Sequence, residues 1–563
     1  MPVSLPLPTD FSSFTFTDFI QEPANLEYLS REALLTFLPQ QRWFMSKGKV
    51  VAGCTVEHVF VINAYTAILL CRTTFVDGSS DLYQLPVAWN TEPEWLDFFG
   101  QFNSHQIIAS FGEPVVAILS DAIPRANFRK QLFTEMKART ERVDTLSYDA
   151  GKGLRDFSGE VTSILPNIDT SNTAIIYGDA YFFKLFRKLD PGLNPDLELI
   201  RYLSEETPFD NSPAYGGSMT VGKVDDPTSI NLGLMIEKVD NHGDAWELFQ
   251  ELTEGYYNRV MAHLNKLGSV VENKGENGSP GRTEHRMIPS FQPVASHADL
   301  PTPVASLIDA NTYHRAALLG QRTAEMHLAL AGAPAERTAL ATEPLTQEYR
   351  QEIFQAGKKM LDRQFTELSD KIAGLAEDQQ AEAKAVLEAR DQIEARLAAI
   401  KDQVITADIC RVHGDYHLGQ VLYTDTDYYI IDFEGEPLLS IPERRRKRPP
   451  FKDVAGMIRS FHYAAQGQLL LNSKYTKEER EALAPWGDLW FRHMRHAFLS
   501  AYLETAGDAP FVPIMASERE DLLDFFVMEK AIYEVAYELN SRPDWLAIPL
   551  RGLLFALIDN LGR

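Results

Sequence analysis

The chain has 563 residues, of which 45% are hydrophobic, and its formal net charge at pH 7 is -25. This length and apolar content predict two or three globular domains and exclude a disordered chain. So strong a negative charge argues against nucleic acid or an anionic membrane surface as the main partner. A phosphate-binding site in this chain would therefore have to be locally basic.

The cysteines and the N-terminus bear on the compartment. Cys54, Cys71 and Cys410 lie far apart and match no metal-ligand spacing, so we expect buried thiols in a reducing compartment. The N-terminal segment MPVSLPLPTDFSSF lacks the basic and apolar regions of a signal peptide. No stretch approaches the roughly 18 apolar residues that a membrane span needs. We therefore expect a cytoplasmic protein without membrane association.

The first quarter of the chain predicts a small module of its own. Residues 1–25 are rich in Pro, Ser and Thr and favour an extended lead-in, whereas 26–38 favour a helix and 50–87 favour strands. Trp43 stands between the cations Arg42 and Lys47. These three residues are either functional or simply a packed tryptophan between solvated charges, and the sequence leaves both interpretations open.

A second set of strands begins near residue 150. The segment SNTAIIYGDAYFFKLFRKL predicts two strands joined by a turn at Gly178 and Asp179. Lys184 lies inside the second, apolar strand. A lysine there either marks an edge strand with a snorkelling stem or reaches nucleotide phosphates, as the strand lysine of protein kinases does.

Residues around this lysine extend the second interpretation. Asn194 and Pro195 are a plausible N-cap and first residue of a helix on which Glu198 can face Lys184. The Ser171-Asn172-Thr173 turn stands where kinases carry a Gly-rich phosphate loop, although no GxGxxG is present and a simple turn is the alternative. Residues 232–239 predict a buried strand that ends at a hinge, where backbone groups near Glu237 and Val239 would meet an adenine ring.

The middle of the chain contains a break and then long helices. Residues 269–303 are rich in Gly, Ser and Pro and predict a flexible surface insertion. His327, in the helical segment that follows, is more often a packed histidine than a catalytic one and stays a weak site candidate. Residues 346–404 have almost no helix breakers and predict two long helices or a helical hairpin.

Two acidic motifs joined by a short apolar hairpin occupy residues 411–437. His413-Gly414-Asp415 opens the first motif, and Gln420 follows five residues after Asp415. Asp432-Phe433-Glu434 comes directly after an apolar strand at 428–431. This order and spacing are those of kinase catalytic and metal-binding motifs.

Phosphoryl transfer needs a carboxylate that orients the attacking hydroxyl and oxygen ligands for magnesium. Asp415 suits the first role and Gln420 and Asp432 the second, with Glu434 as a further carboxylate. The alternative is a β-hairpin with solvated acids, which the agreement of two motifs disfavours. His413 and His417 lie beside this base and are candidate substrate contacts.

Two further groups of polar residues follow. The basic run at 444–448 suggests nucleic acid or a targeting signal, but in so acidic a chain we expect local compensation with Glu434, Glu436 or a phosphorylated substrate. Near the C-terminus, Tyr533 and Tyr537 share one helix face, as do Glu534 and Glu538. Rings beside carboxylates and Arg542 suit a sugar, whereas the alternative is an ordinary amphipathic helix.

Several segments together resemble the bacterial maltokinases, which occur as separate enzymes and fused to trehalose synthase. The matching segments are RWFMSKGK, SNTAIIYGDAYFFKLFRKLDPGLNPDLELIRYL, GQRTAEMHLAL, HGDYHLGQVL, IIDFEGEP, DVAGMIRSF and YELNSRPDWLAIPLRGLL. The resemblance implies an α+β, bilobal, eukaryotic-protein-kinase-like (aminoglycoside phosphotransferase-like) fold. It divides the chain into an N-terminal cap (1–135), a nucleotide-binding N-lobe (136–240) and a helical C-lobe (241–563).

The resemblance also implies an activity. It is transfer of the ATP γ-phosphate, with Mg²⁺, to the anomeric hydroxyl of maltose, giving maltose 1-phosphate for trehalose, glycogen and α-glucan metabolism. Carried over by motif, Asp415 is the base, Gln420 and Asp432 hold the metal, and the nucleotide is bound by Lys184, Glu198 and residues 171–173. Tyr533, Tyr537, Glu538 and Arg542 line the sugar, and a trehalose synthase or another glucan-pathway enzyme is a possible protein partner.

Two other functions remain open. One is a kinase of the same fold that acts on choline, an aminoglycoside or a different sugar. The other is a pseudokinase that binds a glucan enzyme, against which the intact Lys184, Asp415, Gln420 and Asp432 argue. The departures from the family are the insertion between 253 and 310 and a longer helical segment before the catalytic motifs.

Overall fold

We analysed a computed structural model, which describes residues 3–5, 15–95, 98, 104–112, 115–138, 146–159, 161–166, 172–222, 228–272, 289–437 and 439–558. The chain divides into two compact units. Unit 1 comprises residues 1–206, 213–238 and 439–443, and unit 2 comprises 207–212, 239–438 and 444–563. Each unit is described by itself.

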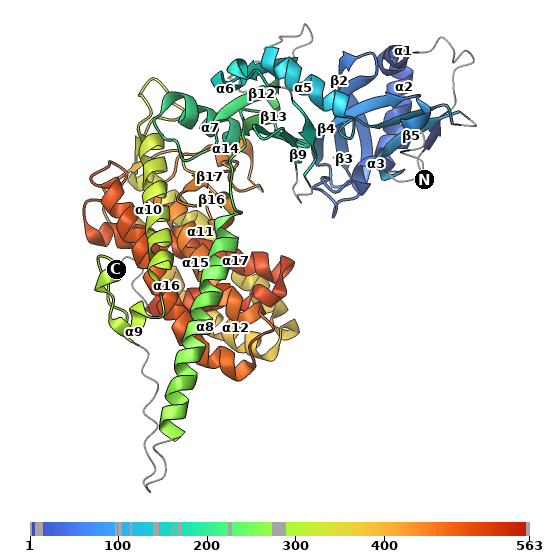
Figure 1. Ribbon diagram of the computed structural model, residues 1–563. Helices are drawn as coiled ribbons and strands as arrows, with labels where there is room; N and C mark the ends of the chain where they lie inside the picture. Colours follow the sequence, from blue (N-terminus) through green and yellow to red (C-terminus); the bar gives the residue numbers. More distant parts are fainter. Residues whose placement is uncertain are drawn as a thin grey trace. The chain divides into compact units, whose positions relative to one another are not determined.

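The N-terminal part of unit 1 is a sheet covered by short helices (Figure 1). The strand order is β1-β5-β6-β4-β3-β2, and β11 pairs with β4 outside this path. Its helices are α1 (Phe16–Gln21), α2 (Pro23–Tyr28), a π-helical turn (Leu29–Leu34) and α3 (Leu35–Gln40), whereas α5 (Ala126–Ala138) follows in the sequence and packs on the second sheet of this unit. Its strands are β1 (Val3–Leu5), β2 (Val51–Asn63), β3 (Thr66–Phe75), β4 (Ser80–Asn90), β5 (Ile107–Phe111), β6 (Ala117–Asp121) and β11 (Lys188–Leu189).

Aromatic packing explains why these elements form a stable module. Phe19 packs against Trp89 and Phe111 with ring centroids 5.3 and 5.2 Å apart, which joins α1 to the sheet. Phe44 stacks on Tyr83 at 4.9 Å. The helix expected at 26–38 and the strands expected at 50–87 are confirmed. The extended lead-in is wrong for residues 16–21, which form α1 because Thr15 caps it and its apolar residues are buried.

The second sheet of unit 1 has the order β7-β12-β13-β10-β9-β8 and is entirely antiparallel. Its strands are β7 (Leu146–Ala150), β8 (Ser163–Ile164), β9 (Thr173–Tyr177), β10 (Tyr181–Leu185), β12 (Tyr215–Val221) and β13 (Ile230–Glu237). The predicted hairpin is confirmed: β9 and β10 meet at Gly178, whose φ of 57° a glycine adopts without strain. The helices beside this sheet are α6 (Lys152–Asp156) and α7 (Pro195–Glu206).

Unit 2 is largely helical, as predicted. Its helices are α8 (Ala245–Glu272), α9 (Thr302–Ala305), α10 (Ala310–Ala331), α11 (Gln347–Lys371), α12 (Glu377–Glu388), α13 (Arg390–Asp402), α15 (Phe451–Leu471), α16 (Lys477–Ala506), α17 (Ala516–Ser541) and α18 (Ala547–Ile558). The hairpin predicted inside the acidic motifs is present as β16 (Val421–Tyr423) and β17 (Tyr428–Ile430). A second small ladder pairs β14 (Glu343–Pro344) with β15 (Asp408–Ile409), and the short α14 spans Ile441–Arg444.

The central helix of unit 2 is α15, in which almost every residue is buried. Such all-round burial marks a helix enclosed by others, and α15 contacts α8, α16 and α17. Gly320 lets α10 approach α16 closely, because a Cβ at this position would lie 2.1 Å from the carbonyl oxygen of Phe498.

Two expectations need correction. Residues 346–404 form three helices rather than two, with breaks at residues 372–376 and at Ala389. The flexible insertion expected at 269–303 is wrong at both ends, because α8 continues to Glu272 and a helical turn at His297–Asp299 and α9 from Thr302 lie inside its other end. The centre of that insertion, 273–288, lies outside the described residues. Within the described part of the chain, no helix has both the length and the apolar character to cross a membrane.

Candidate functional site

The loop that carries Asp415 is held by one buried carboxylate on α15. Asp453 accepts hydrogen bonds from the backbone N–H groups of His413 and Gly414, at 2.7 and 3.0 Å. The Nε2 atom of His327 lies 3.1 Å from the same carboxylate, and both residues are at most 1% exposed. Burial opposes ionisation of Asp453, but His327 and His413 overcome this and hold the pKa of Asp453 below its usual range. His327 therefore positions the loop and is not at the surface of the site.

Asp415 faces a lysine that the sequence analysis did not identify. Lys530 Nζ, on α17, lies 3.3 Å from Asp415 Oδ1, and each side chain is about one-quarter exposed. Burial works against ionisation of Asp415, but Lys530, His417 and His413 together lower the pKa of Asp415 below its usual value. The carboxylate is thus ionised at neutral pH, as a proton acceptor must be.

The two histidines of the first motif have different surroundings. His413 is 1% exposed, its Nε2 donates to the carbonyl of Ile431 at 2.9 Å, and its ring packs on Phe433 at 4.9 Å. His413 therefore links the two motifs, and its role as a substrate contact stays a prediction that this burial disfavours. His417 Nδ1 accepts from the Gly419 N–H, and burial lowers the pKa of His417, so its neutral imidazole carries the proton on Nε2.

Gln420 and Asp432 are brought together as predicted. The Nε2 atom of Gln420 donates to Asp432 Oδ2 at 2.9 Å, and the Ile431 N–H donates to the Gln420 carbonyl at 3.0 Å. Asp432 is the one non-glycine with positive φ among the described residues, at 68°. Such a conformation is costly for a residue with a side chain and is typical of functional loops.

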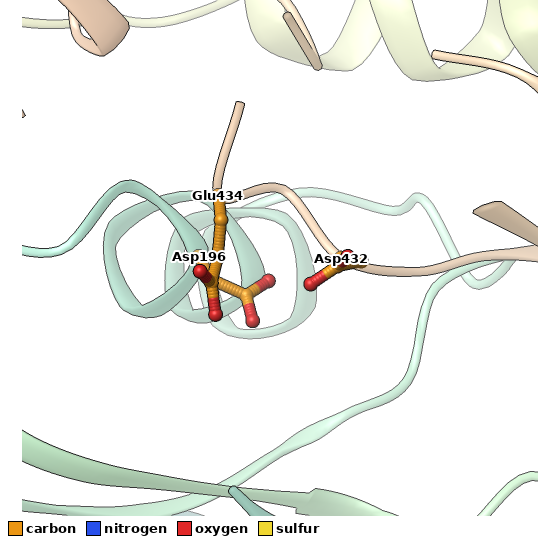
Figure 2. Close-up of side chains that lie close together, drawn as sticks. All are labelled: Asp196, Asp432 and Glu434. Atoms are coloured by element: carbon orange, nitrogen blue, oxygen red, sulfur yellow. The ribbon is translucent and has the colours of Figure 1, made fainter. Parts of the chain in front are cut away.

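Asp432 and Glu434 present carboxylates from one short segment. Figure 2 shows both side chains on the chain that follows β17, and one carboxylate oxygen of each lies within 4.8 Å of the other. Carboxylate and amide oxygens are the donors that Mg²⁺ accepts in phosphotransfer sites. The donor set of Asp432, Glu434 and Gln420 therefore fits the magnesium implied by the sequence.

The helix α17 continues the polar site beyond Lys530. The ammonium of Lys530 lies 5.2 Å from the ring centroid of Tyr533, and the Tyr533 and Tyr537 rings stack 6.3 Å apart. The guanidinium of Arg542 lies over the rings of Tyr537 and Trp545, at 5.3 and 4.7 Å. The predicted shared face of the tyrosines is confirmed.

The two glutamates of α17 face inward. Glu534 pairs with Arg459 at 2.6 Å, and Glu538 is 1% exposed with both oxygens accepting from Arg542. Tyr463 also donates to Glu538, at 3.0 Å. Glu538 thus orients Arg542 rather than offering an open carboxylate, and its expected role as a direct sugar ligand does not agree with this burial.

The basic run is compensated locally. Arg446 pairs with Glu352 at 2.7 Å, Lys447 pairs with Glu343, and Arg444 Nη1 lies 3.5 Å from the Glu434 carbonyl oxygen. The nearby Lys452 lies 3.5 Å from Glu436. Compensation was expected, but the partners Glu352 and Glu343 come from the segment 343–352 and were not foreseen.

In unit 1, the lysine of β10 has a carboxylate partner. Lys184 Nζ lies 2.7 Å from Asp196 Oδ2, with side-chain exposures of 14% and 0%. Asp196 lies in the first turn of α7 and is labelled in Figure 2. The Asn194 side chain accepts from the Asp196 N–H at 2.8 Å, which confirms the predicted N-cap. Sequence analysis named Glu198 as the partner and passed over Asp196.

The remaining described nucleotide-site candidates lie in or beside the second sheet of unit 1, except Val239, which belongs to unit 2. Asn172 and Thr173 lie at the start of β9, after the connection from β8, whereas Ser171 lies outside the described residues. Glu237 ends β13, and its backbone N–H donates to the Ala214 carbonyl. The Val239 carbonyl accepts from the Asn241 side chain at 2.9 Å. Their contact with adenine stays a prediction.

Comparison with known families places these sites in context. Residues 258–485 match the phosphotransferase enzyme family, and residues 37–102 match the maltokinase N-terminal cap domain. The fold and the two matches define a kinase-like phosphotransferase with an N-terminal cap. The cap match is to a domain described for maltokinases, and it spans only residues 37–102 of this chain.

Curated relatives and solved structures give the same class. The chain is 26% identical over 251 residues to a glucosamine kinase of Streptacidiphilus jiangxiensis, covering 44% of this chain and 50% of the relative. It is 30% identical over 176 residues to a glucosamine kinase of Mycolicibacterium smegmatis, covering 30% and 39%. The chain thus matches half or less of the length of these relatives.

A structure of glucosamine kinase in complex with glucosamine, ADP and inorganic phosphate aligns with a TM-score of 0.57. The identity is 18%, and the alignment covers 93% of this chain and 98% of that one. Another glucosamine kinase structure, crystal form A, gives a TM-score of 0.59 at 17% identity, covering 95% and 98%. At this identity the likeness concerns the fold, which agrees with the kinase-like fold expected from the sequence.

Proposed function

We propose that the chain transfers the γ-phosphate of ATP to the anomeric hydroxyl of maltose, giving maltose 1-phosphate and ADP. The observation that carries the proposal is the arrangement around Asp415 in unit 2. An ionised carboxylate lies on a loop fixed by Asp453, and Gln420 and Asp432 are hydrogen-bonded to each other on the adjoining motif. We further propose that residues 1–135, 136–240 and 241–563 act as cap, nucleotide-binding part and catalytic part.

In the proposed reaction, the Asp415 carboxylate accepts a hydrogen bond from the sugar hydroxyl and takes its proton as the oxygen attacks phosphorus. The bond from the γ-phosphorus to its bridging oxygen breaks, the new O–P bond forms, and ADP leaves. Asp432, Glu434 and Gln420 would hold magnesium, which neutralises charge on the phosphates when bound. Lys184 would contact the phosphates, and Asp196 keeps its ammonium in place.

The choice of sugar rests on the cap and on α17. The cap matches the maltokinase model, whereas the curated relatives carry the name glucosamine kinase. Glucosamine is an amino sugar and is cationic when protonated. Lys530 places an ammonium 3.3 Å from the proposed base, so a second cation there would be repelled. This favours a neutral sugar, and the stacked Tyr533 and Tyr537 suit its C–H faces.

A kinase for glucosamine, choline or an aminoglycoside is the second candidate. A panel of maltose, glucose, glucosamine, choline and kanamycin with ATP and magnesium, read by ADP release, separates it from the first. Phosphorus NMR of the product then distinguishes an anomeric phosphate from one at a primary hydroxyl. Maltose as the best substrate with phosphate at the anomeric carbon is expected; preference for a cationic substrate would overturn the proposal. No turnover of any member would favour the pseudokinase.

Replacement of the base tests the mechanism. Asp415→Asn should lower kcat by about 10²–10⁴-fold while leaving ADP binding, measured by calorimetry, unchanged. Asp425→Asn is a matched control, because Asp425 lies at an exposed turn of the same hairpin and pairs only with His242 among the interactions described. Unchanged turnover in Asp415→Asn would remove the assignment of the base. A trehalose synthase partner belongs to the same proposal and rests on the family resemblance. A cytoplasmic location is proposed with it and rests on the cysteines and the N-terminal segment of the sequence.

A further inference from the structure

The two sheets of unit 1 are joined at the segment that follows β10. There, β11 pairs with β4 in the register Lys188 with Tyr83, and the Gln84 N–H donates to the Arg187 carbonyl at 2.7 Å. The Gln84 side chain is fully buried, and its Nε2 donates to the carbonyls of Phe186 and Leu232, each at 2.8 Å. The first sheet is therefore hydrogen-bonded to both central strands of the second.

Arg187 is buried at this join, with 2% of its surface exposed. Its Nη2 lies 2.7 Å from Asp121 Oδ2, at the end of β6, and its guanidinium lies 4.6 Å from the ring centroid of Trp43. The other Asp121 oxygen accepts from the Ile123 N–H at 2.9 Å, which fixes the carboxylate. A buried guanidinium is stable only with such partners, so the first sheet determines where Arg187 lies.

The third contact of Arg187 leads to the other sheet. Its Nε donates to Thr173 Oγ1 at 2.8 Å. Thr173 is itself one of the residues proposed to cover the nucleotide phosphates; it begins β9 and pairs with Leu185 on β10. The next pair in the ladder is Ala174 with Lys184. One side chain thus connects Asp121 and Trp43 of the first sheet to the start of the strand beside the proposed phosphate lysine.

We infer that the N-terminal cap orders the proposed nucleotide site through Arg187, which acts as a positioning residue. The inference rests on the proposed function, because it assigns nucleotide to this part of unit 1. A phosphate-contacting residue that is held in place beforehand, as Thr173 is by Arg187, loses less conformational freedom when phosphates bind, and this strengthens binding. Trp43 and Asp121 then influence nucleotide affinity without touching the nucleotide, which gives the tryptophan between Arg42 and Lys47 a role.

The test changes Asp121, which lies outside the proposed nucleotide contacts. Asp121→Asn keeps an oxygen for the Ile123 N–H but removes the charge that holds Arg187. We expect the Kd of ADP, measured by calorimetry without sugar, to rise about tenfold, which is the loss of one charge-assisted hydrogen bond. The KM for the sugar should not change. Trp43→Phe, a milder change, should weaken ADP binding in the same direction.

A matched control and a double-mutant cycle separate positioning from general stability. Glu57→Gln removes an exposed ion pair with Arg72 on the same sheet and should leave the Kd of ADP unchanged. In an Arg187→Met background, Asp121→Asn should add no further loss of ADP affinity, because both act through one guanidinium.

The outcomes distinguish the inference from the proposed function. Lys184→Met should weaken ADP binding if the nucleotide site is assigned correctly. If Lys184→Met weakens ADP binding while Asp121→Asn and Trp43→Phe lower only the melting temperature, the positioning role is overturned and the nucleotide site stands. If Lys184→Met has no effect on the Kd of ADP, the proposed nucleotide site itself fails.

Discussion

Asp415 and Lys530 form an ion pair of 3.3 Å between the catalytic loop and α17, although 115 residues separate them in the sequence. The pair fixes the charge and the direction of the proposed base. Burial lowers the pKa of Lys530, but Asp415 and two further acids, Glu436 and Glu534, raise it above its usual value. The ammonium is therefore charged at every pH at which the enzyme would be assayed.

Removal of Lys530 should change both pH dependence and selectivity. In Lys530→Met, burial continues to disfavour the Asp415 carboxylate while its main cation is gone, so the pKa of Asp415 rises. A base must be ionised, so the acidic limb of the kcat/KM profile moves to higher pH. The ratio of kcat/KM for glucosamine to that for maltose should rise about tenfold as like-charge repulsion is removed. Lys474→Gln, an exposed surface lysine, is the control; an unmoved acidic limb in Lys530→Met would contradict the assignment.

Asp453 should affect turnover without contacting substrate. Asp453→Ala leaves the His413 and Gly414 N–H groups and His327 without their shared acceptor. We expect unit 2 to lose about 3–5 kcal/mol of stability. kcat should fall further than the KM of either substrate changes. Chemical denaturation and steady-state kinetics measure the two effects, and His327→Gln should give a smaller loss of the same kind. A destabilised Asp453→Ala enzyme with full kcat would show that the loop does not need this anchor.

The contribution of Asp453 to folding stability should decrease at low pH. The pKa of Asp453 is lowered in the folded state, so its contribution is present above the unfolded value of 3.8 and is lost as pH falls through the lower folded value.

Arg542 should contribute to binding of the sugar rather than to chemistry. Its guanidinium donates two hydrogen bonds to Glu538 and lies over two rings, a geometry that a lysine cannot reproduce. Arg542→Lys should raise the KM for maltose about tenfold, with a smaller change in kcat. Arg551→Lys, at a partly exposed pair with Glu382, is the matched control. A tenfold fall in kcat with constant KM would instead show that Arg542 stabilises the transition state.

His493 should make unit 2 sensitive to mild acid. Its ring is 1% exposed, neither ring nitrogen has a hydrogen-bond partner among the described residues, and burial lowers its pKa to about 4. Between its unfolded value of 6.5 and about 4, the unfolded chain binds the proton and the folded chain does not. Stability is therefore lost as pH falls through this window. His493→Phe should reduce the drop in melting temperature between pH 7 and 5, and the exposed His314→Asn should not.

The local sequence predicted the residues that lie on one short segment. Asp415, Gln420 and Asp432 were found because a hairpin of fixed length brings its two ends together. The pair of Arg542 with Glu538 could also be predicted from the sequence, since residues four apart share a helix face. By contrast, Lys530 and Asp453 act on the loop from helices far along the chain, and helical periodicity alone does not say which element a face meets.

Similar reasons explain the other differences. Asp196 and Glu198 both fall in the first turn of α7, and the correctly predicted cap at Asn194 does not say which side of that turn faces β10. The helix break after Lys371 had a signal in Gly374, whereas the junction at Ala389 had none. Arg187 was not identified from the sequence, because its partners Asp121 and Trp43 come from strands and turns over 60 residues earlier.

Gly414 and Gly435 both have positive φ, and a Cβ on the first would lie 3.3 Å from the Cα of the second. At this point the two motifs of unit 2 therefore meet through bare backbone, and a side chain added at Gly414 would press on Gly435. Anyone building libraries to redirect the enzyme to another acceptor should leave both positions unchanged and place diversity on the last turns of α17, where Tyr537 is 45% exposed.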